Sequence, residues 1–116
     1  MVKRALLGLY EPRQGKMFKI FAMGAGYEPV LVSGRAAFLE ELQRNNYGVC
    51  VFDANLEIPW GVDISLARDV RDYVVSRGVS LRIHPITGHS DLYSQLLEEG
   101  FDAKLKGSFN IKDLFV

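Results

Sequence analysis

One segment of the sequence, residues 47–59 (YGVCVFDANLEIP), constrains the fold more than any other. Its apolar run carries no charge and ends abruptly at Asp53. A short apolar run closed by turn-forming residues is typical of a strand buried on both faces of a parallel sheet. Asp53 would then stand at the carboxyl end of that strand, where open α/β sheets bind ligands. It is either a residue that caps the strand end or a working carboxylate.

The rest of the chain alternates between strand-like and helix-like patterns. We predict strands over residues 4–9, 28–32, 81–86 and 101–106, together with the apolar strand that ends at Asp53. We predict helices over residues 12–25, 33–44, 63–76 and 90–99, with a short last helix over 111–116. Five strands alternating with helices indicate an α/β protein with a parallel sheet covered on both faces.

Three details of this pattern predict local structure. In the first helix we expect an apolar stripe formed by Met17, Phe18, Ile20, Phe21 and Met23. Ser33 is the expected cap of the second helix, whose inward residues would be Ala37, Phe38 and Leu42. Pro85 lacks a backbone N–H, so we expect it at the extremity of the fourth strand.

The composition limits the class of protein. A chain of 116 residues predicts a single domain, residues 1–116. Its 14 basic and 14 acidic residues balance, so we expect neither nucleic acid nor a membrane as a partner. The single cysteine, Cys50, excludes an internal disulfide and is expected to be a small core residue. The N-terminal apolar run is too short for a signal sequence, and we expect a cytoplasmic protein.

Several short motifs together resemble the receiver domains of two-component response regulators. The similarity covers nearly the whole chain and lies in the order and spacing of five segments. They are residues 6–12 (LLGLYEP), 25–28 (AGYE), 52–59 (FDANLEIP), 86–89 (ITGH) and 99–103 (EGFDA). The resemblance implies the flavodoxin-like doubly wound sheet with strand order 2-1-3-4-5.

The resemblance also implies roles for particular residues. Asp53 matches the phospho-accepting aspartate of the family, and Thr87 matches the hydroxyl residue that senses the phosphoryl group. Lys106 takes the place of the family's strand-five lysine only if one residue is inserted after it. The two acids that bind magnesium in receivers are replaced here by Leu9 and Tyr10. The chain therefore resembles a degenerate receiver, or pseudo-receiver.

The replaced acids bear directly on the chemistry. Phosphoryl transfer to a carboxylate depends on positioning and on a metal that neutralises charge. Mg²⁺ is usually held by one or two carboxylates together with waters. Asp53, the Asn55 backbone carbonyl and, more weakly, Glu11 are the protein ligands that remain. We therefore expect weak or no phosphorylation, with Lys106 either a solvated residue or a counter-ion of Asp53.

Three functions compete at this stage. The leading hypothesis is a non-enzymatic pseudo-receiver that binds a signalling protein, either a histidine kinase or a downstream effector, with a homodimer as a further option. The second is a working receiver that uses Asp53 with an altered metal site. The third is a small-ligand-binding domain in which Tyr10 and Trp60 stack on a ring, although the chain has no phosphate-binding glycine motif.

Other polar residues carry weaker signals. Thr87 and Ser108 should lie at the same sheet edge as Asp53, where their hydroxyls could hold a phosphate or sulfate, although loop hydroxyls more often satisfy nearby backbone groups. His84 and His89 flank Pro85 without further ligands at metal-binding spacing, so a metal site there is not expected. Trp60 is either a cover for the strand edge or a partner-contact residue.

Overall fold

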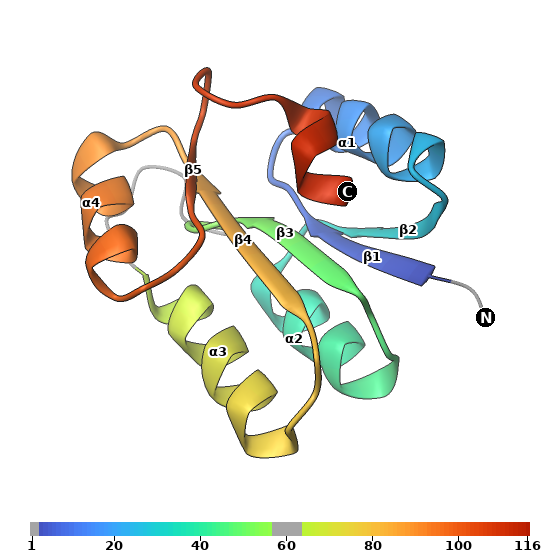
Figure 1. Cartoon of the computed structure of the whole chain (residues 1–116), viewed down its shortest axis with the longest axis horizontal. Helices are drawn as coiled ribbons and strands as arrows, with labels where there is room; N and C mark the ends of the chain where they lie inside the picture. The colour runs from blue at the N-terminus through green and yellow to red at the C-terminus, as the bar shows by residue number, and fades with distance from the viewer. Residues whose placement is uncertain (1–2, 57–63) are drawn as a thin grey trace.

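The computed structural model describes residues 3–56 and 64–116 and contains a five-stranded parallel sheet in the order β2-β1-β3-β4-β5 (Figure 1). The strands are β1 (Lys3–Gly8), β2 (Tyr27–Val32), β3 (Val49–Asp53), β4 (Arg82–Thr87) and β5 (Lys104–Leu105). The helices are α1 (Pro12–Gly24), α2 (Arg35–Arg44), α3 (Ser65–Arg77), α4 (Ser90–Glu98) and the 3₁₀ helix η1 (Ile111–Phe115). This confirms the predicted α/β class and the flavodoxin-like strand order.

The segment that ends at Asp53 forms the central strand. All five residues of β3 are buried, and Cys50 lies between Leu6 of β1 and Ile83 of β4 in the sheet register. Burial raises the pKa of the Cys50 thiol, as expected for a core residue rather than a reactive one. The prediction of a strand buried on both faces is confirmed.

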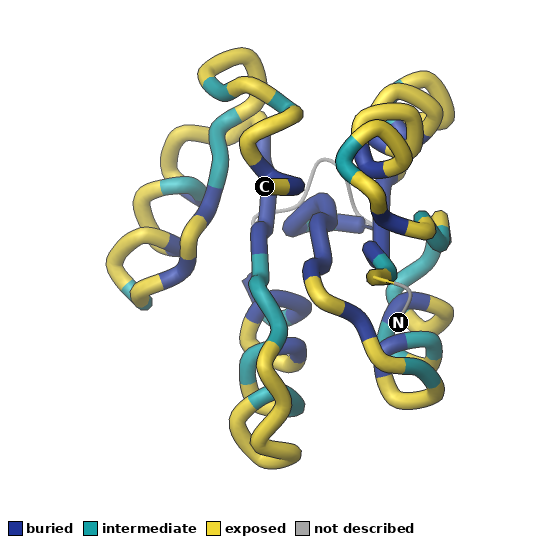
Figure 2. Tube along the Cα trace, turned by 45° about the vertical axis from the view of Figure 1, so that its right-hand side comes forward, coloured by how far each residue is buried: buried dark blue, intermediate teal, exposed yellow. Residues whose placement is uncertain are grey.

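Alternating residues of the strands build one core on each face of the sheet. Phe38, Phe52 and Leu96 belong to the core under α2, α3 and α4. Leu7, Val51 and Phe115 belong to the core under α1 and η1. Figure 2 shows the result, a dark blue interior with the exposed surfaces of the helices outside it. Both faces are covered, which is what continuous apolar strands require.

The predicted apolar stripe of α1 is largely wrong. The buried residues of this helix are Gly15, Phe18 and Ala22. The other four members of the stripe, Met17, Ile20, Phe21 and Met23, are exposed. A Cβ atom on Gly15 would lie 3.0 Å from Leu31 Cδ2, so this small residue lets the helix approach the sheet closely. The buried face of α1 therefore consists of two small residues and Phe18, and the other large apolar side chains of the helix point outward.

The second helix differs from its prediction at its start. The α2 helix begins at Arg35, one residue after an extended Gly34, and Ser33 provides no side-chain cap. Phe38 and Leu42 are buried as expected, whereas Ala37 is exposed. Arg35 instead ties the helix start to α3, because its guanidinium donates to Ser65 Oγ at 2.7 Å and to Asp69 Oδ2 at 2.5 Å.

Pro85 lies inside β4, not at its extremity, which corrects the prediction. The Ile86 carbonyl points toward β3 and accepts from Ala54 N at 2.8 Å, while the Thr87 carbonyl points toward β5 and accepts from Lys106 N at 2.8 Å. Backbone alternation therefore turns Pro85 toward β5. That strand has only two residues, shorter than the predicted 101–106, and pairs no earlier than Ile86. The missing N–H of Pro85 thus faces an unpaired edge.

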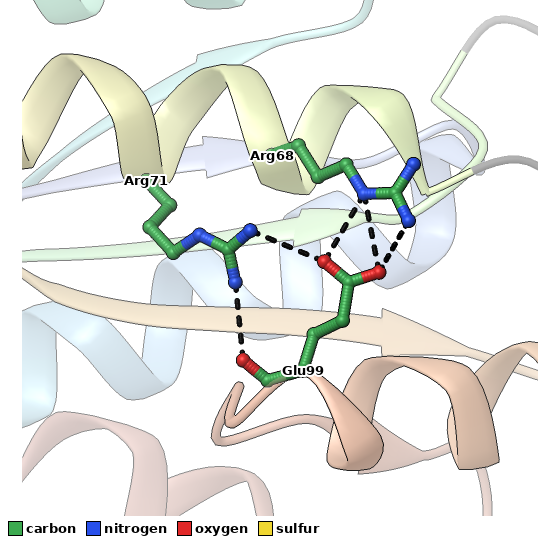
Figure 3. A network of polar contacts seen from close by, with 3 residues as sticks. All are labelled: Arg68, Arg71 and Glu99. Carbon is green, nitrogen blue, oxygen red and sulfur yellow. Dashed lines mark hydrogen bonds and ion pairs between the residues drawn. The ribbon is translucent and has the colours of Figure 1, made fainter.

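An arginine pair joins α3 to the end of α4 (Figure 3). Arg68 forms a forked ion pair with the Glu99 carboxylate, and Arg71 donates to a Glu99 side-chain oxygen and to its backbone carbonyl, each at 3.1 Å. The Arg68 hydrogen bond is the main reason that the pKa of Glu99 is lowered below 4.5. These contacts hold α4 at a fixed distance from α3 beside the sheet.

The last helix is short, as predicted, and has 3₁₀ geometry. Asn110 caps it by accepting from Lys112 N at 3.3 Å. Leu114 and Phe115 are buried against α1 and Tyr27, so η1 closes the core that a longer helix would otherwise cover. Among the described residues, no helix is both long and apolar enough to cross a membrane.

Candidate functional site

Asp53 lies at the carboxyl end of β3, where the alternation of strand and helix places it by sequence. It is only 5% exposed, although it is charged. Its Oδ2 accepts a hydrogen bond from the backbone N–H of Tyr10 at 2.7 Å, just beyond the end of the neighbouring β1. Charge-assisted bonds of this kind are stronger than neutral ones. Asp53 therefore caps a strand-end amide, which is one of the two roles expected for it.

Lys106 neutralises the second carboxylate oxygen. Its Nζ lies 3.0 Å from Asp53 Oδ1, and this oxygen accepts no hydrogen bond within the described chain, so the contact is an ion pair without a directed N–H bond. The chain brings Lys106 there because β5 ends at Leu105 and the Lys106 amide still bonds to the end of β4. Gly107 then turns the chain away with φ 84°. Of the two alternatives for Lys106, the structure shows the counter-ion.

Thr87 occupies the corresponding end of β4. It is almost fully buried, and its Oγ1 accepts a hydrogen bond from the backbone N–H of His89 at 3.1 Å. His89 itself is exposed and directly precedes α4. This bond is of the kind expected from the sequence, because a loop hydroxyl more often satisfies a nearby backbone group, here the amide two residues further on.

These side chains surround one small cavity of about 150 Å³ at the carboxyl edge of the sheet. Three loops contribute to it, those after β1, β3 and β4, together with the end of β5. Every site residue predicted from the resemblance reaches it, and its wall is formed by Tyr10, Glu11, Asp53, Ala54, Asn55, Ile86, Thr87, Gly88, His89 and Lys106. The sequence therefore identified the residues that meet at this edge.

The donor set does not fit a preformed magnesium site. Leu9, in place of one receiver acid, is buried in the apolar core, and the Tyr10 side chain, in place of the other, is 53% exposed. The two oxygens of Asp53 already face an N–H donor and an ammonium group. Within the described ranges, no cluster of three His, Cys, Asp or Glu residues could hold a metal ion. Mg²⁺ would have to compete with Lys106 for the buried carboxylate of Asp53.

The remaining sequence candidates lie elsewhere. Ser108 is exposed, does not line the cavity, and its amide bonds to the Leu105 carbonyl at 3.0 Å. His84 is buried within β4, with Nδ1 3.3 Å from the Asp102 carbonyl oxygen, and burial is the main reason that its pKa is lowered. Trp60, predicted to cover the strand edge, contact a partner or stack on a ligand ring, lies outside the described residues.

Comparisons with known proteins identify the fold. No family model and no curated protein sequence matches the chain. Solved structures do match, among them a response regulator protein TrrA from Thermotoga maritima, in complex with Mg(2+)-BeF, at 24% identity and a TM-score of 0.75, covering 97% of this chain and 93% of that one. The chemotaxis response regulator CheY4 of Vibrio cholerae matches at 18% identity and a TM-score of 0.75, with coverage of 98% and 93%. A response regulator receiver domain protein from Clostridium thermocellum matches at 19% identity and a TM-score of 0.74, with coverage of 99% and 89%.

The chain thus has the fold of response-regulator receiver domains over nearly its whole length. The predicted resemblance to that family is confirmed at the level of structure. At these identities the similarity establishes the architecture, and the chemistry of the site has to be argued from its own residues.

Proposed function

We propose that this chain is a receiver-like signalling domain of the two-component type that acts by binding a protein partner, with weak or no phosphorylation of Asp53 and no enzymatic activity of its own. The observation that carries the proposal is the state of the Asp53 carboxylate. Lys106 pairs with one of its oxygens, the Tyr10 amide donates to the other, and Leu9 and Tyr10 stand at the positions where receivers hold two acids.

The physical argument concerns charge. Transfer of a phosphoryl group to Asp53 would bring several negative charges into a cavity whose only nearby cation from the described chain is Lys106. A metal ion bridging the phosphoryl oxygens supplies most of the compensation in such reactions. Leu9, buried in the apolar core, supplies no ligand for such an ion, so the developing charge stays poorly compensated.

The partner that suits this fold is another signalling protein, a histidine kinase or a downstream effector. If the Asp53 carboxylate is not phosphorylated, the surface that the domain presents to its partner stays the same. Its signalling output would then depend on whether the partner is present. In this proposal Asp53 and Lys106 serve to hold the ends of β1, β3 and β5 together.

Labelling of Asp53 by a small phosphodonor tests the proposal. The folded protein is incubated with acetyl phosphate and Mg²⁺, and the phosphoryl adduct is measured by intact mass spectrometry. Asp53→Asn removes the acceptor, and Asp102→Asn, at an exposed aspartate, is the matched control. We expect no adduct in any of the three proteins. Strong labelling that disappears only in Asp53→Asn would overturn the proposal.

One observation favours the alternative, a phospho-accepting receiver with an altered metal site. Asp53, Thr87 and Lys106, the acceptor and phosphoryl-site candidates, line a single cavity with Asn55 and Glu11. The discriminating measurement is a beryllofluoride titration with Mg²⁺, followed by the fluorescence of Trp60, which is seven positions after Asp53 in sequence. A saturable response that is lost in Asp53→Asn favours this alternative, and a flat response from folded protein favours the pseudo-receiver.

A further inference from the structure

The outward surface of α1 combines apolar and basic side chains. Ile20 and Met23 are 69% and 58% exposed, and Met17 lies beside them. Arg13, Lys16 and Lys19 are also exposed, and none of them forms an ion pair with the part of the chain that the structure describes. The helix contains no acidic residue. We call this surface the α1 face, formed by Arg13, Lys16, Met17, Lys19, Ile20 and Met23.

The outward surface of α4 has the opposite character. Asp91 and Glu98 are exposed, seven residues apart and therefore on nearly the same side of the helix. Leu97 is 46% exposed beside them. No lysine or arginine occurs anywhere between Arg82 and Lys104. We call this surface the α4 face, formed by Asp91, Ser94, Leu97 and Glu98.

The balanced net charge of the chain therefore conceals a separation of charge. The α1 helix contacts β1 and β2 at one end of the sheet, and α4 contacts β4 and β5 at the other end. Figures 1 and 2 both show the two helices on opposite flanks of the molecule, blue and orange in Figure 1. Within one copy these faces cannot meet.

A symmetric dimer would place like charges together. Two α1 faces would oppose three cations against three cations, and two α4 faces would oppose acids against acids. Such juxtapositions cost free energy and suppress association. An α1 face against an α4 face instead pairs cations with acids and covers Ile20 and Leu97.

We propose that two copies of this chain bind each other head to tail, with the α1 face of one against the α4 face of the next. The inference goes beyond the proposed function, because it does not involve Asp53 or the cavity around it. A head-to-tail contact leaves one face of each kind free at the ends, so it continues into a longer assembly or closes into a ring. One helix against another buries less surface than a stable dimer, so the association is weak.

Sedimentation velocity of the intact chain at micromolar to millimolar concentration tests this directly. We expect the mean mass to rise with concentration beyond that of a dimer and to fall when salt is added, because the Debye length shrinks from about 10 Å at 0.1 M to about 3 Å at 1 M ionic strength. A mass that stays monomeric throughout this range would overturn the proposal.

Charge-reversed variants identify the faces. Lys16→Glu with Lys19→Glu makes the α1 face acidic, and Asp91→Lys with Glu98→Lys makes the α4 face basic. Each pair of substitutions alone should weaken self-association by about tenfold or more, because like charges then oppose each other. Arg44→Glu with Arg77→Glu, at the ends of α2 and α3, changes the net charge by the same amount as the α1 variant and should have no such effect.

Mixing the two reversed proteins provides the sharpest test. The acidic α1 face of one variant then meets the basic α4 face of the other, so the mixture should associate where each protein alone does not. Ile20→Ser should also weaken association, and Val75→Ser, at an exposed valine of α3, should leave it unchanged. A mixture of the two variants that stays monomeric would refute the head-to-tail contact. The contact would also be refuted if the α1 variants self-associate as before and lose only their binding to anionic phosphatidylglycerol vesicles or to an acidic peptide.

Discussion

Nζ of Lys106 lies 3.0 Å from Oδ1 of Asp53, so the ion pair joins the end of β5 to the end of the central strand. Asp53 is the last residue of β3 and Lys106 is the first residue after β5. A difference of one residue in the length of either strand would separate the two side chains. The pair therefore depends on β5 ending at Leu105 and on the Lys106 amide bonding to the Thr87 carbonyl. The charge of Asp53 is balanced by the chain itself.

A double-mutant cycle measures what this pair contributes. Among the described residues, the Lys106→Met substitution leaves the nearly buried carboxylate with only the Tyr10 amide as a partner, and we expect it to lower the free energy of unfolding by about 1–3 kcal/mol. Because the Lys106 side chain is 39% exposed, the coupling free energy with Asp53→Asn should be smaller, about 1 kcal/mol or less. Urea denaturation of the four proteins provides both values. Strictly additive effects would show that the ammonium does not interact with Asp53.

The metal site offers a gain-of-function prediction. Tyr10 is exposed at the cavity rim, so Tyr10→Asp would add a carboxylate beside Asp53 without burying a new charge, and the backbone N–H that bonds Asp53 is kept. We expect the variant to bind Mg²⁺ with a saturable heat in isothermal titration calorimetry, because Mg²⁺ favours paired carboxylates.

Two controls accompany this titration. Tyr10→Asn introduces a side chain of nearly the same shape as aspartate but without its charge. Like the unmodified protein, this variant should give no saturable heat. If the unmodified protein binds Mg²⁺ as tightly as Tyr10→Asp does, the conclusion that the native donor set does not fit the ion is wrong.

The sequence was sufficient to predict the sheet and the members of the site. Asp53 and Thr87 are the last residues of β3 and β4, and parallel strands in this order bring their carboxyl ends to one edge. Lys106 could not be placed from sequence, because its position depends on the length of β5, and a two-residue strand has too few side chains to show a period. The contact between Lys106 and Asp53 could be recognised only once the end of β5 was located in the structure.

The orientation of α1 shows a second limit of sequence reasoning. Apolar residues occur around most of this helix, so their spacing does not select one inward face. The structure buries Gly15 and Ala22, whose small side chains let Phe18 reach the core, and Leu31 packs against Gly15. Hydrophobicity favours the larger residues as core members, whereas close approach of the helix to the sheet favours the small ones.

His84 predicts a pH dependence of stability. Burial lowers its pKa in the folded state below 6.5, and its Nε2 has no hydrogen-bond partner in the described chain. As the pH falls below 6.5, the unfolded chain therefore takes up a proton before the folded protein does. The stability contributed by neutral His84 is present above pH 6.5 and is lost as the pH falls toward the lowered folded-state value.

Thermal unfolding on both sides of pH 6.5 measures this effect. The midpoint of the unmodified protein should decrease as the pH falls below 6.5, and His84→Leu should remove this part of the dependence. The exposed His89 supplies the control, since His89→Gln should keep the full decrease. An identical pH profile for His84→Leu and the unmodified protein would contradict the assignment.

Two glycines should respond to alanine with opposite signs. At Gly8, the end of β1, a Cβ atom would lie 2.6 Å from Phe38 Cδ2 and 3.2 Å from Leu56 Cδ2, so the ring of a fully buried phenylalanine would have to move. Overpacking of this kind costs about 1–3 kcal/mol, and we expect Gly8→Ala to lower the free energy of unfolding by that amount.

At Gly24, the last residue of α1, no atom lies within 4 Å of the position that a Cβ would take, so Gly24→Ala should stabilise the protein by about 0.5–1 kcal/mol. Urea denaturation of both variants at one pH decides the matter, and equal signs would show that the packing around Gly8 is looser than these distances imply.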